Sequence, residues 1–156
     1  MVGDRIRILG VGIVGAILMF LVQPWLFQSG MIPITQVEVE PWISEKYTVG
    51  AAIVFSTALV AALLWYISAL RAKVTNFNDS SPMRLVWGLL LLIPIIGICA
   101  ALYFYNDSSE ARLPLTFIYV IDIAWVYWFG TTISSPGLLK FIPPGSFTVR
   151  HLIGLK

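Results

Sequence analysis

Four apolar segments, each about as long as a lipid bilayer is thick, constrain the fold of this chain more than any other feature. They cover residues 6–27, 49–70, 85–105 and 114–133. About 20 helical residues cross about 30 Å of hydrocarbon, and each segment has roughly that length. The backbone satisfies its polar groups in lipid only within a helix or a closed barrel, and the alternating pattern of a barrel is missing here. The sequence therefore predicts an all-α integral membrane protein whose four helices form one bundle, a single domain covering residues 1–156.

The composition agrees with this class and restricts the chemistry. Hydrophobic residues make up 58% of the 156 residues and charged residues 12%, whereas soluble proteins have about 25% charged residues. The charges nearly balance, which argues against a nucleic-acid partner. A single cysteine, Cys99, and a single histidine, His151, are too few for a disulfide or a conventional metal or haem site. We therefore predict no cofactor from this chain alone; a partner would supply the ligands of any pigment, haem or metal.

The positively charged residues predict how the chain is threaded. Eight of the ten Lys and Arg residues lie at the N-terminus, in the second connection and in the tail, and two lie in the other connections. Because cations are retained on the cytoplasmic side, both termini are predicted to be cytoplasmic. The first apolar run is too long for a signal peptide and no small-residue cleavage site follows it, so we expect it to be retained as the first span. The eight residues are Arg5, Arg7, Arg71, Lys73, Arg84, Lys140, Arg150 and Lys156.

Two segments lie outside the predicted spans. Residues 28–48 are predicted to form an outer loop in which QVEVEPW alternates like a short strand that Pro41 ends. This loop is either a simple link, a small cap or a partner contact. Residues 134–156 are too short and too rich in proline for a fifth span, and we interpret them as a basic, interfacial C-terminal tail. Its cations are expected to meet anionic lipid head groups or to dock a partner; they are Lys140, Arg150 and Lys156.

Small residues indicate where helices approach each other. Gly12 and Ala16 in the first span, and Ala58 and Ala62 in the second, have the spacing of small-xxx-small packing motifs. We therefore expect the first two spans to pack tightly through these residues.

Pro94 and Gly97 mark the third span. Proline removes one backbone donor, frees the carbonyl four residues earlier and bends a helix. A helix kink is predicted there, as a passive bend or as part of a site.

Asp122 is the one carboxylate placed well inside a predicted span. A carboxylate near the centre of a membrane helix costs about 2.5 to 3.5 kcal/mol, so such groups seldom face lipid. Counting depth at about 1.5 Å per residue places Asp122 level with two hydroxyl side chains of the second span. Gln23 lies closer to the outer end by the same count. The predicted intramembrane polar site comprises Asp122, Ser56, Thr57, Tyr119 and Trp125.

Two hypotheses account for Asp122. No Lys, Arg or His lies at its depth, so the chain offers it no cationic partner. Either Asp122 is protonated and donates a hydrogen bond to Ser56, Thr57 or a backbone carbonyl, or its partner is a group on another subunit.

Three classes of function compete. The sequence favours a small non-catalytic membrane subunit or assembly factor of a larger complex. Its expected partners are the lipid bilayer and other membrane subunits or further copies of itself. Transport of a proton or cation through Asp122 is the alternative, because an intramembrane carboxylate is typical of transporters. A membrane enzyme acting on a lipid-like substrate is disfavoured, since the acidic residues are scattered and form no catalytic cluster.

Overall fold

The computed structural model describes residues 2–34, 38–105 and 109–155, and within these ranges the chain is helical with no β-strand. Four helices are long and apolar enough to cross a membrane. They cover Gly3–Gln28, Val39–Arg71, Ser81–Phe104 and Ala111–Ser134. The prediction of an all-α chain with four such helices is confirmed.

Three of these long helices are composite. The first joins α1 (Val2–Ile17), a π-helical turn (Leu18–Val22) and α2 (Gln23–Gln28). The second joins α3 (Val39–Trp42), a π-helical turn (Ile43–Tyr47) and α4 (Thr48–Arg71). The third is α5 (Ser81–Tyr105), preceded by a 3₁₀ turn (Phe77–Ser80). The fourth joins α6 (Ser109–Ile123), a π-helical turn (Ala124–Phe129) and α7 (Gly130–Ser134). The tail holds a 3₁₀ turn (Gly137–Phe141) and α8 (Ser146–Leu152).

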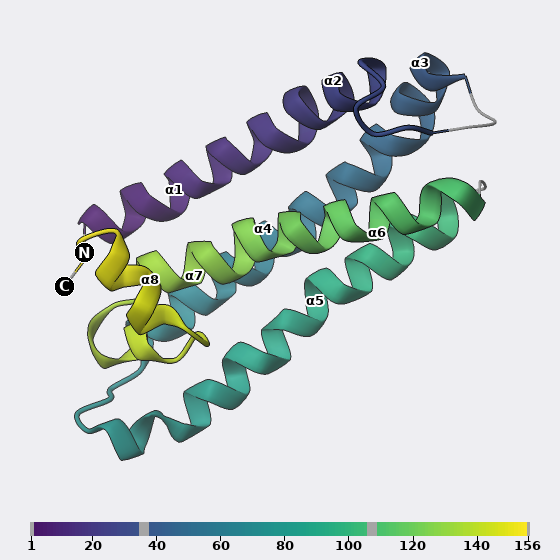
Figure 1. The fold of residues 1–156 in the computed structure, drawn as a ribbon. Coiled ribbons are helices and arrows are strands. Elements are labelled where there is room, and N and C mark those ends of the chain that lie inside the picture. Colours follow the sequence, from purple (N-terminus) through teal and green to yellow (C-terminus); the bar gives the residue numbers. More distant parts are fainter. Residues whose placement is uncertain (1, 35–37, 106–108, 156) are drawn as a thin grey trace.

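The long helices lie side by side, with α4 at the centre of the bundle. Figure 1 shows α1 and α5 on opposite sides, with α4 and α6–α7 between them. Both described ends of the chain lie at one end of the bundle, together with α8 and the connection from α4 to α5. Among the helix pairs, α4 makes its most extensive contact with α5 and also touches α1, α6 and α7.

The second long helix begins earlier than the hydropathy predicts. The predicted loop at residues 28–48 is helical from Val39, and the strand predicted there is wrong for residues 39–42; residues 36 and 37 lie outside the described ranges. Pro41 is tolerated because it stands in the first helical turn, where no helical partner is lost. Phe27 stabilises this extension, since its ring packs edge-on against Trp42 and Tyr47 with centroids 5.3 and 5.2 Å apart.

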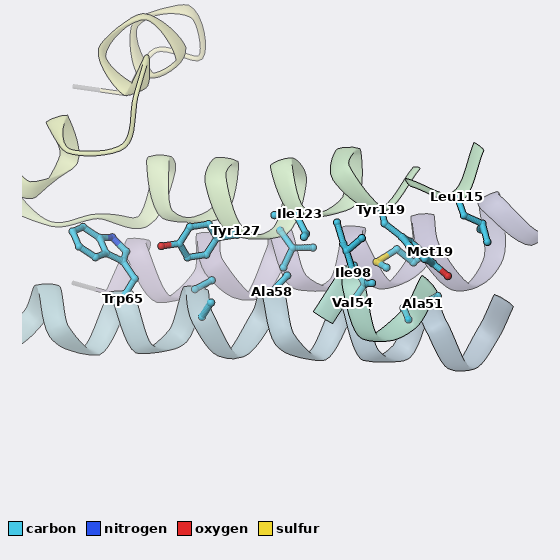
Figure 2. Packing of buried hydrophobic residues seen from close by; sticks show 14 of the residues in the cluster. Met19, Ala51, Val54, Ala58, Trp65, Ile98, Leu115, Tyr119, Ile123 and Tyr127 are labelled. Carbon is cyan, nitrogen blue, oxygen red and sulfur yellow. The ribbon is translucent and has the colours of Figure 1, made fainter. Parts of the chain in front are cut away.

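Small side chains on α4 allow the other helices to come close. Ala51, Ala58 and Ala62 are buried in the core, together with larger residues of the neighbouring helices. Figure 2 shows Ala51 and Ala58 in a row along the bundle, with Met19 and Tyr119 toward one end and Trp65 toward the other. The outer faces of the bundle carry exposed leucine, isoleucine and phenylalanine side chains, as expected of surfaces that meet lipid.

The predicted packing of the first two spans has a different form in the structure. Gly12 and Ala16 line an apolar groove of about 280 Å³ between α1 and α4, and Ala58 and Ala62 are not part of its lining. A Cβ added to Gly12 would meet Leu59, at 3.5 Å. The close approach of α1 occurs instead at Gly15, where an added Cβ would lie 2.8 Å from Val126 of the fourth span.

Helix α5 runs without a break from Ser81 to Tyr105 through Pro94, which is buried. The kink predicted at this position stays a prediction. Gly97 has a packing role that the sequence did not indicate, because an added Cβ would collide with the hydroxyl of Thr57 on α4.

Candidate functional site

Three π-helical turns lie next to the polar residues inside the bundle. The first turn ends directly before Gln23, the second ends at Tyr47, and the third begins two residues after Asp122. In a π-helical turn the backbone hydrogen bonds join residues i and i+5, so the side chains that follow point in other directions than in a regular α-helix. Such turns are frequent at functional sites. These turns therefore mark one level of the bundle as unusual in its backbone as well as in its side chains.

Asp122 is joined to two other spans by hydrogen bonds. Gln23 donates from Nε2 to Asp122 Oδ1 over 2.6 Å. The Tyr47 hydroxyl lies 2.5 Å from Gln23 Oε1 and 2.8 Å from the carbonyl oxygen of Met19, and both can accept its proton. Asp122 is 4% exposed, so this network is buried inside the bundle. The first, second and fourth spans are thus connected by one polar chain.

Tyr119 completes this site. Its ring stacks on Tyr47 with centroids 6.4 Å apart, and both side chains are almost fully buried. Gly50 leaves room for the Tyr119 hydroxyl, which would lie 2.6 Å from a Cβ at that position. Within the described part of the chain, Asp122 Oδ2 has no hydrogen-bond partner, although it is buried. Buried polar atoms are usually satisfied, and this oxygen is the one carboxylate oxygen among the four buried side-chain atoms of the described residues that have no hydrogen-bond partner.

The structure brings together only part of the predicted polar site. Thr57 donates to the carbonyls of Ile53 and Val54 in its own helix, and Ser56 is exposed. The expectation that one of them bonds to Asp122 is wrong, because Gln23 reaches the carboxyl instead. Trp125 lies on another side, where its indole nitrogen is 3.3 Å from the carbonyl oxygen of Val11.

Sequence reasoning missed Gln23 and Tyr47 as members of the site. Counting depth along straight helices ignores both the extra residue in each π-helical turn and the reach of a glutamine side chain. A signal was present, since Gln23 is the single amide side chain in residues 6–27.

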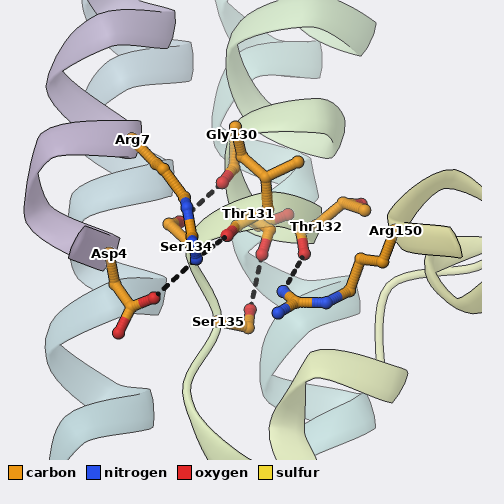
Figure 3. Close-up of polar contacts among 9 residues, drawn as sticks. Asp4, Arg7, Gly130, Thr131, Thr132, Ser134, Ser135 and Arg150 are labelled. Atoms are coloured by element: carbon orange, nitrogen blue, oxygen red, sulfur yellow. Dashed lines mark hydrogen bonds and ion pairs between the residues drawn. The ribbon is translucent and has the colours of Figure 1, made fainter. Parts of the chain in front are cut away.

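A second polar cluster closes the end of α7. Residues 131–135 are all buried; residues 131–134 form the last turn of the fourth long helix, and Ser135 follows it directly. The final carbonyls of a helix have no partner within it, and cations near them are stabilising. Figure 3 shows how these carbonyls are capped: Arg150 donates to Thr132 O over 2.9 Å, Arg7 lies 3.4 Å from Ile133 O, and Ser135 Oγ donates to Thr131 O over 2.5 Å. The two ends of the chain therefore meet on one helix terminus.

Two tryptophans extend this cluster into the core. Trp65 donates from its indole nitrogen to Ser135 Oγ over 2.8 Å, and Trp87 donates to Thr131 Oγ1 over 3.0 Å. The Tyr127 hydroxyl donates to the carbonyl of Trp87 over 2.5 Å. Every hydroxyl and indole in these contacts is buried, so the polar end of α7 is bonded to α4 and α5.

The tail departs from its prediction at Arg150. This side chain is 6% exposed and donates to Thr132 O at the end of α7, so it is not the exposed surface cation that the sequence predicts. Its predicted contact with lipid head groups or a partner stays a prediction. Burial and the charge of Arg7 lower the pKa of the Arg150 guanidinium from its usual value. Lys140 lies with its ammonium group 5.1 Å from the centre of the Phe141 ring. Lys156 lies outside the described residues.

The described residues contain no group of three His, Cys, Asp or Glu side chains that could hold a metal ion. No family model, no curated protein and no solved structure matches this chain.

Proposed function

We propose that this chain is a non-catalytic accessory subunit or assembly factor of a larger membrane complex. The observation that carries the proposal is the apolar groove between α1 and α4, which has a volume of about 280 Å³. In this proposal the groove receives a transmembrane helix of a partner protein.

The shape and lining of the groove suit a helix. Gly12 and Ala16 lie on the same face of α1, four residues apart, and small residues at this spacing let two helix backbones approach closely. Phe55, Leu59 and Leu63 of α4 supply larger apolar side chains on the other side. In lipid, helices associate through this kind of van der Waals packing, because lipid offers little hydrophobic driving force.

Asp122 has an internal role in this proposal. Its carboxyl is held by Gln23 at 2.6 Å and lies away from the lining of the groove. It therefore joins the spans of the subunit together, and partner recognition depends on the shape of the α1–α4 face.

The test compares the same substitution on two faces of α1. Gly12→Leu places a side chain in the groove, whereas a Cβ at Gly10 meets nothing within 4 Å. We expect Gly12→Leu to abolish co-purification of other membrane proteins in mild detergent, with Gly10→Leu retaining them. Equal recovery of the partners with both variants contradicts the proposal. If the wild type purifies only with further copies of itself, the groove is a homo-oligomer contact and the accessory role is rejected.

We further propose that both termini are on the cytoplasmic side. Eight of the ten Lys and Arg residues belong to the N-terminus, the second connection and the tail, and cations are retained on that side. The end of the bundle that holds α8 is then cytoplasmic.

Transport is the second candidate, and it rests on Asp122 Oδ2. This buried oxygen has no hydrogen-bond partner within the described residues and belongs to a network that includes Tyr47. Such an atom suits binding of a proton or a small cation. Ion or proton flux in proteoliposomes that Asp122→Asn abolishes would favour this function over the accessory role.

A further inference from the structure

The tail forms a small pocket with a distinctive lining. It has a volume of about 170 Å³ and lies between the 3₁₀ turn Gly137–Phe141 and α8. Its lining includes two cations, an imidazole and two phenyl rings, and no acidic residue of the described chain takes part. The lining residues are Lys140, Phe141, Phe147, Arg150, His151 and Leu155.

The aromatic rings give the pocket an ordered wall. Phe141 and Phe147 have centroids 6.3 Å apart, and Phe147 stacks on His151 at 6.4 Å with nearly parallel planes. Lys140 lies over the outer ring of this row, 5.1 Å from the centre of Phe141. The ammonium group of Lys140 and the imidazole of His151 thus lie against one row of aromatic rings. The guanidinium of Arg150, which also lines the pocket, is held in place by its hydrogen bond to Thr132 O.

The charge near the pocket is positive. Arg7 adds a third cation next to Arg150, and Asp4, which is the acid within electrostatic reach of Arg150, also forms an ion pair with Arg7 at 3.0 Å. Guanidinium and ammonium groups bind phosphate oxygens through charge-assisted hydrogen bonds. An anion in the pocket is therefore favoured over a cation or a neutral molecule.

The position of the pocket selects the source of the anion. The last apolar helix ends at Ser134, so the residues directly after it fall at the depth of lipid head groups. Next to the pocket, Phe147 is 69% exposed and Leu152 is 78% exposed, which is typical of a short segment that lies in the membrane interface. A lipid can place its phosphate among the cations and its acyl chains along these side chains.

We propose that the pocket between Gly137–Phe141 and α8 binds the phosphate of one anionic phospholipid from the adjacent leaflet. Lys140 and Arg150 contact the phosphate oxygens, and His151 offers a further hydrogen bond. This inference is independent of the groove between α1 and α4. In this proposal the tail binds one lipid in a defined pocket, in addition to any general attraction between its cations and the membrane surface.

The experiment measures bound lipid on the full chain. The protein is reconstituted with an equal mixture of phosphatidylglycerol and phosphatidylcholine and extracted in mild detergent. Native mass spectrometry then gives the mass of the protein with its bound lipids. The wild type is expected to retain one phosphatidylglycerol in preference to phosphatidylcholine. Lys140→Gln should weaken retention about fivefold, the effect of one cation near a membrane surface.

A matched variant separates the pocket from general attraction. Lys73 is exposed in the connection that follows α4, at the same end of the bundle as α8, so Lys73→Gln removes the same charge outside the pocket. Retention in Lys73→Gln should equal that of the wild type. Equal losses in both variants, or no preference for phosphatidylglycerol in the wild type, would overturn the proposal.

A competition arm identifies the source of the phosphate. Inorganic phosphate lacks acyl chains, so it should not displace the retained lipid at matched concentration. Displacement by inorganic phosphate would mean that the pocket takes a soluble anion, and it would reject the lipid assignment. Phe147→Ser tests the acyl contact, because it should reduce retention without changing the charge of the pocket.

Discussion

Gln23 donates a 2.6 Å hydrogen bond to Asp122, although 99 positions separate these residues in the sequence. The bond connects the first span to the last one. It uses Oδ1 of Asp122, and the other carboxyl oxygen, Oδ2, has no hydrogen-bond partner among the described residues. Because Gln23 also accepts from Tyr47, one amide side chain holds three spans at the same level. The bundle is therefore tied together by this polar contact at one level and by the polar cluster at the end of α7 at another, with apolar packing between them.

Removing this amide should loosen the bundle. Gln23→Leu deprives Asp122 of its donor and Tyr47 of one acceptor. We expect a loss of about 1 to 2 kcal/mol in the free energy of unfolding, measured by denaturant titration in mixed micelles. Gln28→Leu on the exposed end of α2 is the control and should have a much smaller effect.

A double-mutant cycle assigns the loss to the pair. If the two side chains act together, Gln23→Leu with Asp122→Leu should cost about 1 kcal/mol less than the sum of the two single variants. Strict additivity would mean that the hydrogen bond contributes nothing to stability.

Gly97 and Gly88 give a matched comparison within α5. An added Cβ at Gly97 collides with the Thr57 hydroxyl, whereas a Cβ at Gly88 meets nothing within 4 Å. Gly97→Ala should destabilise the bundle by about 1 to 3 kcal/mol because of overpacking. Gly88→Ala should be neutral or stabilising by up to about 1 kcal/mol, since alanine is the better helix former. Thermal unfolding in detergent separates the two.

The collision also predicts a rescue. Thr57→Ala removes the hydroxyl that a Cβ at Gly97 would meet. The Cβ of residue 57 would still lie 3.1 Å from the added Cβ, so combining Thr57→Ala with Gly97→Ala should restore part of the lost stability. A double variant as unstable as Gly97→Ala alone would contradict the proposed contact.

Arg150 should be required for the end of α7. Arg150→Met removes the donor to Thr132 O and should cost about 1 to 3 kcal/mol, because a buried carbonyl loses its partner. Limited proteolysis should also cut the tail faster, since the side chain that ties α8 to the bundle is lost. Arg71→Met, at an exposed arginine of the same charge, should change stability by no more than about 0.5 kcal/mol. Similar proteolysis of both variants would show that Arg150 is not a cap.

Cysteine labelling tests the proposed orientation. In a Cys99→Ser background, Asn76→Cys lies at the end of the bundle that holds α8, and Gln28→Cys lies at the opposite end. A membrane-impermeant maleimide added to intact cells should label position 28 and not position 76. The reverse pattern would invert the orientation.

The sequence predicts the spans well because length and hydropathy determine them, but it predicts their ends and contacts poorly. The second helix extends back to Val39 because Trp42 and Tyr47 pack on Phe27, and no hydropathy count includes that contact. The sequence predicts that Asp122 lies beside Thr57, although the hydroxyl of Thr57 bonds to carbonyls of its own helix. These errors share one cause: side-chain reach and backbone irregularity depend on neighbours that are distant in the sequence.

The tail shows the same limit. Basic residues after a final span are usually interpreted as surface charges, and Lys140 and Arg150 have the same sequence signature. Residues 131–134 are buried at the end of α7, and the last carbonyls of this helix require donors. In this chain the short polar stretch at the end of an apolar helix is thus the signal that a nearby arginine is buried and caps the helix.

The capping of α7 also has a consequence for assembly. The carbonyl of Thr132 receives its donor from Arg150, which lies 18 residues further along the chain. Insertion of the four apolar helices therefore does not complete the fold, because the end of α7 is capped by Arg150 only when the tail packs against it. Docking of the tail is the closing step of the bundle.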